Sequence, residues 1–113
     1  MKTERAEIRE ILPQELADRL RRGDRPVILD VREPGEIEIA RFPGATMLIP
    51  MSEVPSRIAE LDPDAEMVVL CHHGIRSAQV AMYLARLGFG HVSNLRGGID
   101  LWSATVDSNV PRY

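Results

Sequence analysis

Short apolar runs alternate with segments of helical periodicity along this chain, and this alternation constrains the fold more than any other feature. Residues 26–31 are apolar almost throughout and end beside charged residues, which is typical of a buried strand in a parallel sheet. Residues 67–70 form a second such run. Because strands that alternate with helices pair in parallel through crossover connections, the pattern predicts an α/β fold with a mainly parallel sheet.

The other predicted elements follow from turn signals and spacing. Further strands are expected at residues 7–11, 45–49 and 91–95. Helices are expected from Pro13 to the stop at Gly23, at 36–40 after a break at Pro34-Gly35, from an N-cap at Ser52 to Leu61, and at 78–87 and 99–103. The segment 78–87 is apolar nearly all round, which predicts that this helix is well buried.

Length and composition indicate one domain that spans residues 1–113. The 113 residues are 44% hydrophobic, enough for one core, which we expect over about residues 8–103 with an extended tail at 104–113. The net charge is −3, and the chain lacks the basic stripe of a nucleic-acid-binding protein. No apolar run approaches the ~18 residues that a membrane helix needs.

The chain contains a single cysteine, Cys71, which excludes an internal disulfide and a cysteine-rich metal cluster. The charged start of the chain has no apolar segment of the kind that a secretory signal requires. A reducing compartment suits these features, so we expect a cytoplasmic protein.

Cys71 opens the loop Cys71-His72-His73-Gly74-Ile75-Arg76-Ser77, between the apolar run 67–70 and the next helix. Loop amides and the positive end of a helix dipole favour negative charge at this place, and Arg76 adds a full positive charge. Such surroundings favour the reactive thiolate. The alternative is a buried structural thiol, but the strand-end position, Gly74 and Arg76 argue against it.

Other polar residues follow neighbouring strands. In open α/β sheets ligands bind beyond the carboxyl ends of the strands, where Asp30, Arg32 and Arg96 are also expected. Asp30 either acts as a general acid or, as we expect, anchors loop amides or pairs with an arginine, because a buried carboxylate needs partners.

His72 and His73 next to Cys71 raise the possibility of a metal site. We expect no metal, because three consecutive side chains point apart, whereas zinc ligands are usually separated by intervening residues. One of the histidines is expected at the mouth of the pocket, partly exposed. No cofactor is expected either.

These motifs together resemble the rhodanese sulfurtransferases in their single-domain form. The resemblance lies in residues 27–33, the segment around Glu36, residues 42–45, residues 69–77, and residues 95–99 with Trp102. The set is specific in its order and spacing. One departure is Arg41-Phe42, where the family usually has His-Ile.

The resemblance implies a three-layer rhodanese-like α/β fold, with a five-stranded, mainly parallel sheet and helices on both faces. It implies that Cys71 is the catalytic nucleophile and that Arg76 binds an anionic substrate. The loop residues implied to hold the transferred sulfur are His72, His73, Gly74, Ile75 and Ser77. Asp30 and Arg32 are implied to support the site, while the roles of His73 and Arg96 in specificity stay open.

The implied activity moves a sulfane sulfur from thiosulfate or another persulfide donor to a thiophilic acceptor through a Cys71 persulfide. Because there is no second cysteine, the acceptor must be an external thiol, cyanide or a partner protein. A non-catalytic interaction module of the same fold is one alternative. A phosphatase or arsenate reductase is another, although only four residues separate Cys71 from Arg76, where the related phosphatases have five.

Overall fold

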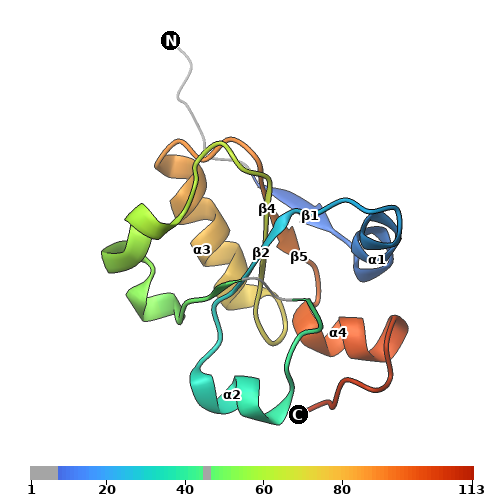
Figure 1. Cartoon of the computed structure of the whole chain (residues 1–113). Helices are drawn as coiled ribbons and strands as arrows, with labels where there is room; N and C mark the ends of the chain where they lie inside the picture. The colour runs from blue at the N-terminus through green and yellow to red at the C-terminus, as the bar shows by residue number, and fades with distance from the viewer. Residues whose placement is uncertain (1–7, 45–46) are drawn as a thin grey trace.

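The computed structural model describes residues 8–44 and 47–113. They contain one five-stranded sheet in the order β1-β5-β4-β2-β3, in which every pair of neighbours is parallel (Figure 1). The strands are β1 (Arg9–Ile11), β2 (Val27–Asp30), β3 (Met47–Leu48), β4 (Met67–Leu70) and β5 (Val92–Leu95). The predicted α/β class with a parallel sheet is confirmed. Glu7 and residues 45–46, which the sequence placed in strands, lie outside the described residues.

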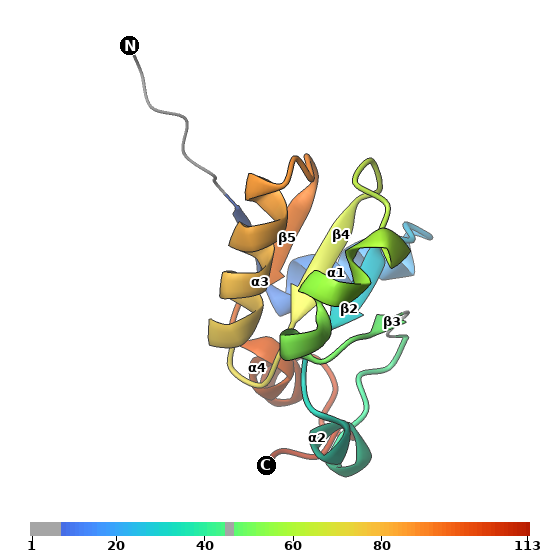
Figure 2. The ribbon, with the colours of Figure 1, turned by 90° about the vertical axis from the view of Figure 1, so that its left-hand side faces the viewer.

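Helices cover both faces of the sheet. On one face lie α1 (Pro13–Arg21) and α4 (Gly98–Thr105), and on the other lie α3 (Ile75–Arg86) and two 3₁₀ segments, η1 (Met51–Glu53) and η2 (Pro55–Glu60) (Figures 1 and 2). Helix α2 (Pro34–Ile39) lies beyond the carboxyl ends of the strands. No helix in the described part of the chain combines the length and the apolar character that crossing a membrane requires.

The central strand β4 divides its side chains between the two cores. Met67 and Val69 pack in the cluster that contains α3, whereas Val68 and Leu70 pack in the cluster that contains α1 and α4. This is the two-residue period of a strand, and all four residues are buried. Neighbouring strands and helices therefore hold β4 on every side, and its carboxyl end, where Cys71 follows, is a firmly held point of the fold.

The helix predicted from Ser52 is wrong in type and in start. The segment forms two 3₁₀ pieces, Pro50 stands at the N-cap of the first, and Ser52 makes no capping bond. Pro55 has no backbone N–H to bond the carbonyl four residues earlier, and the backbone leaves helical angles again at Arg57. The chain therefore uses i to i+3 bonds, such as Val54 N–H to the Met51 carbonyl.

Two further predictions need correction. Helix α3 begins at Ile75 rather than Ala78. Met82 on it and Leu87 directly after it are 37% and 50% exposed, because the helix covers one face of the sheet and turns its other side to solvent. Pro34 does not break the chain but opens α2, since the fixed φ of proline suits the first helical position.

The segment after α4 packs on its own domain. Val110 is buried in the cluster that contains Trp102, and Ser103 donates its hydroxyl hydrogen to the Val110 carbonyl. Thr105 is still part of α4. The last residue, Tyr113, returns to the carboxyl edge of the sheet, close to the loop that carries Cys71.

Candidate active site

Cys71 lies directly after the central strand, at the carboxyl edge of the sheet, and is 1% exposed. Its Sγ accepts hydrogen bonds from the backbone N–H groups of Gly74 at 3.1 Å and Ser77 at 3.4 Å. These amides belong to the N-cap and the first turn of α3, so the positive end of the helix dipole faces the sulfur. The surroundings of Sγ therefore favour the negative charge that a Cys71 thiolate, or a persulfide on Cys71, would carry.

Gly98 and the start of α4 hold the loop through its carbonyl groups. The N–H groups of Ile99 and Asp100 donate to the carbonyls of Cys71 and His72, at 2.9 and 3.0 Å. This approach requires glycine at position 98, where φ is +63° and a Cβ atom would lie 2.3 Å from the His72 oxygen. The loop carbonyls thus point toward α4, which leaves the loop amides free to face the sulfur.

A buried polar chain fixes the hydroxyl of Ser77. The Asn94 Nδ2 group donates to the Gly74 carbonyl at 3.1 Å and to the Glu10 carboxylate at 3.2 Å, so its Oδ1 faces the Ser77 Oγ at 2.5 Å. An amide oxygen only accepts, and the single hydroxyl hydrogen of Ser77 therefore points to Asn94. The Ser77 Oγ, 3.3 Å from Sγ, can accept from the neutral thiol and, after rotation, donate to the thiolate.

Arg76 lies at the site but is already paired. Its Nη1 and Nη2 groups donate to the two carboxylate oxygens of Glu36, both at 2.8 Å. The hydrogen bonds from Arg76 are the largest cause that lowers the pKa of Glu36, to about 2, although burial opposes the shift. The arginine that the resemblance assigns to an anionic substrate thus carries a permanent carboxylate partner.

Asp30 and Arg32 form a second pair behind the first. Both side chains are completely buried, and Arg32 donates through Nε at 3.0 Å and Nη2 at 2.7 Å to the Asp30 carboxylate. The Arg32 backbone N–H also donates to Asp30. With its oxygens engaged in this way, Asp30 holds Arg32 in place and is not available as a general acid.

Tyr113 closes one side of the site. Its ring stacks on the ring of His72, with centroids 3.8 Å apart and planes 3° from parallel. Its hydroxyl donates to Glu36 at 2.9 Å and accepts from the Arg32 Nη1 at 3.0 Å. Sequence reasoning missed Tyr113, and it gave no role to Asn94 or to the pairing of Glu36, because these contacts join residues far apart in the chain.

The remaining predicted residues lie at the rim of the loop. The side chains of Ile75 and His73 are 72% and 58% exposed, and Arg96 is exposed after β5. The rings of His72 and His73 lie 3.8 Å apart, so the expectation that these side chains point apart is wrong.

One group of described residues has the composition of a metal site. Potential ligand atoms of His72, His73 and Asp100 lie within 4.8 Å of one another. The Cys71 sulfur is not a member of this group, and Arg112 already binds both oxygens of Asp100 at 3.0 Å. The group therefore lies beside Cys71 and does not include its sulfur.

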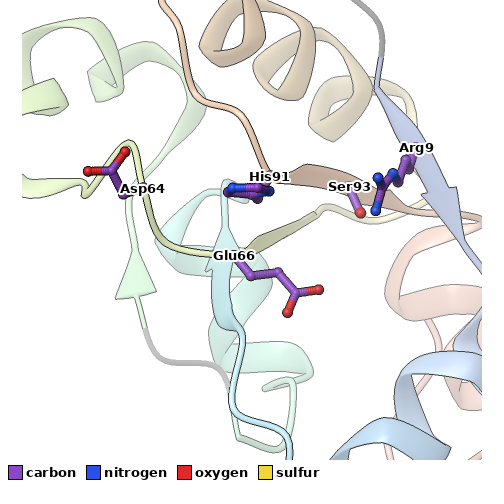
Figure 3. Close-up of a pocket in the computed structure, with 5 residues that line it drawn as sticks. All are labelled: Arg9, Asp64, Glu66, His91 and Ser93. Carbon is purple, nitrogen blue, oxygen red and sulfur yellow. The ribbon is translucent and has the colours of Figure 1, made fainter.

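A polar hollow of about 300 Å³ lies at the other end of the sheet (Figure 3). Its lining residues precede or begin strands: Arg9, Asp64, Glu66, His91 and Ser93. Figure 3 shows their side chains spread along the hollow rather than converging on one point, and Glu66 is bound by Arg19. The length of β4 separates this hollow from Cys71, so it does not belong to the site.

Comparison with known proteins identifies the family to which the chain belongs. The family model "Rhodanese-like domain" matches residues 12–105, which include the loop of Cys71. The chain belongs to the rhodanese-like domain family. The match ends before Tyr113, so the contact of that residue with His72 lies outside the part that this rhodanese-like domain shares with the family model.

The relatives of this rhodanese-like domain include proteins of similar length. A sulfurtransferase of Allochromatium vinosum is 38% identical over 96 residues, which is 85% of this chain and 89% of the relative. The thiosulfate sulfurtransferase GlpE of Ectopseudomonas mendocina is 35% identical over 105 residues, covering 93% and 94%. By contrast, the chain spans only 39% of a chloroplastic Rhodanese-like/PpiC domain-containing protein of Arabidopsis thaliana, at 37% identity.

Solved structures agree with the fold. A rhodanese-like domain protein from Staphylococcus aureus matches with a TM-score of 0.79 and 28% identity, over 94% of this chain and 99% of that one. The three-layer rhodanese-like architecture implied by the resemblance is therefore confirmed.

Proposed function

We propose that this domain is a sulfurtransferase that carries a sulfane sulfur as a persulfide on Cys71. The observation that supports this most is the setting of the Cys71 Sγ, which is buried and accepts from two amides at the start of α3. A terminal persulfide sulfur carries negative charge, and preorganised donors stabilise such charge without reorganisation. The names of the two relatives of similar length support the same reaction class.

In the first half-reaction the Cys71 thiolate attacks the outer sulfur of thiosulfate or of another persulfide donor. A new S–S bond forms at Sγ, the S–S bond of the donor breaks, and its electron pair leaves with sulfite or with a thiolate. The sulfur passes without any oxidant or reductant. Arg76 lies at the entry of the site, where Glu36 accepts two of its N–H groups and offsets its positive charge.

In the second half-reaction a nucleophile attacks the terminal sulfur and Cys71 leaves as the thiolate. Ser77 assists both steps, because its hydroxyl can accept from the thiol or donate to the thiolate. Since Cys71 is the only cysteine in this chain, the acceptor comes from outside, as a small thiol, cyanide in an assay, or a partner protein. A lone unpaired cysteine suits a reducing compartment, and we propose the cytoplasm.

The proposal is tested by steady-state kinetics with thiosulfate and cyanide, with thiocyanate as the measured product. A persulfide intermediate predicts parallel double-reciprocal lines when both substrates are varied, and Cys71→Ser should abolish turnover while keeping the fold. Turnover that survives in Cys71→Ser would contradict the assignment. Phosphate release from an aryl phosphate at a useful rate would support the phosphatase alternative instead.

A further inference from the structure

Three arginines near the entry of the site are paired with carboxylates. Each of three arginines holds a carboxylate through two N–H groups: Arg76 with Glu36, Arg32 with Asp30, and Arg112 with Asp100. We call this region the mouth and define it by Arg76, Glu36, His72, His73 and Tyr113. The Arg76 guanidinium and the Glu36 carboxylate together contribute no net charge to it.

Glu36 is held so firmly that it cannot readily release Arg76. Besides the two bonds from Arg76, its carboxylate accepts the Tyr113 hydroxyl at 2.9 Å and the Glu33 backbone N–H at 3.0 Å. Arg32, itself fixed by Asp30, donates to the same Tyr113 oxygen. The side chain of Glu36 is 20% exposed, and its pKa of about 2 keeps it ionised under any ordinary assay condition.

The charge of the donor therefore matters at this site. Thiosulfate is a dianion that must approach the Cys71 thiolate, and it needs an uncompensated cation to offset the repulsion. Glu36 offsets the positive charge of Arg76, the cation that the resemblance assigns to this role. An organic persulfide carries at most one negative charge on its sulfurs and depends far less on a cation.

We propose that Glu36 is a specificity-determining residue, which disfavours dianionic thiosulfate at the mouth and favours organic persulfide donors. This inference rests on the proposed function and names its donor class. Glu36 acts through Arg76 and not on the reacting atoms. Thiosulfate and the organic persulfide react in the same way. The Cys71 thiolate takes the outer sulfur of the donor, and the electron pair of the broken S–S bond leaves with sulfite or with the organic thiolate.

The test measures sulfur uptake by Cys71 in quenched samples, by intact mass, with thiosulfate or with 2-hydroxyethyl persulfide as the donor. We expect the wild type to react faster with the persulfide. In Glu36→Gln the rate constant with thiosulfate should rise about tenfold, which corresponds to about 1.4 kcal/mol, while the persulfide rate changes less than about twofold. Added salt should slow thiosulfate uptake in Glu36→Gln, because the freed Arg76 now attracts the dianion.

The matched control is Glu60→Gln, which breaks a similar two-bond arginine pair with Arg57 on η2, outside the mouth. It should leave both rates unchanged. An unchanged donor ratio in Glu36→Gln would overturn the inference and leave the proposed function standing. A wild type whose thiosulfate uptake is fast and strongly slowed by salt would overturn it without any variant. Uptake from neither donor would refute the proposed function and this inference together.

Discussion

Gly98 is the position at which a single methyl group should do most damage to the site. Its φ of +63° is strained for any residue with a Cβ atom, by about 1–2 kcal/mol. The added carbon of Gly98→Ala would also lie 2.3 Å from the His72 oxygen and 2.6 Å from the Cys71 oxygen. These are backbone atoms, so the loop and the start of α4 must move apart.

The expected loss of stability can be worked out from these contacts. Forced overpacking typically destabilises by about 1–3 kcal/mol, and the bonds from Ile99 and Asp100 to the loop carbonyls contribute about 0.5–1.5 kcal/mol each. Together with the backbone strain, Gly98→Ala should lower the free energy of unfolding by about 3–8 kcal/mol. This loss is a large part of the total free energy of unfolding of a typical domain, which is ~5–15 kcal/mol.

The assay is denaturant unfolding followed by circular dichroism, together with sulfur uptake by Cys71. The control is Gly88→Ala, where φ is +99° but no described atom lies within 4 Å of the added carbon. Backbone strain alone predicts a loss of about 1–2 kcal/mol there, with normal sulfur uptake. If Gly98→Ala were no less stable than Gly88→Ala, the reasoning from the close approach of α4 to the loop would be refuted.

Two further predictions concern buried polar contacts. Asn94→Asp replaces the amide donor that faces the Gly74 carbonyl and the Glu10 carboxylate by an acceptor. The free energy of unfolding should therefore fall by about 2–3 kcal/mol. Alkylation of Cys71 by iodoacetamide should also become slower. The same change at exposed Asn109 should do neither, and equal effects at both sites would contradict the account. Wild type should exceed Glu36→Gln in stability at pH 7 by about 1 kcal/mol. Because the folded pKa of Glu36 is depressed from 4.5 to about 2, this difference should be lost as pH falls through that range in urea titrations; a difference that persists at pH 2 would contradict the ion-pair explanation.

Local sequence signals predicted the sheet and the position of Cys71 well. The uninterrupted apolar run 67–70 indicated a strand buried on both faces, and β4 is the central strand. The cysteine that follows it is placed by neighbours in the chain, since Gly74 and Ser77 donate to its Sγ. Strand, loop and helix are consecutive here, so local order predicts which amides face the Cys71 sulfur, although the start of α4 and Asn94 also hold the loop.

The partners of the site could not be predicted in the same way. Glu36 lies 40 positions before Arg76 and Tyr113 lies 41 positions after His72, and only the tertiary fold brings them together. Hydrophobic periodicity reports which face of an element is buried and carries no information on which charges meet at its end. The 3₁₀ form of η2 was missed for a different reason, because Pro55 outweighed the helical spacing of its apolar residues.

The central claim is that Cys71 accepts a sulfur atom, and intact mass spectrometry tests it most directly. The protein would be incubated with 2-hydroxyethyl persulfide or with thiosulfate, freed of excess donor, and compared with Cys71→Ser. The account predicts a gain of one sulfur atom on the wild type alone, located at Cys71 and removed again by cyanide. No gain from either donor, or an equal gain in Cys71→Ser, would contradict it and favour a non-catalytic interaction module.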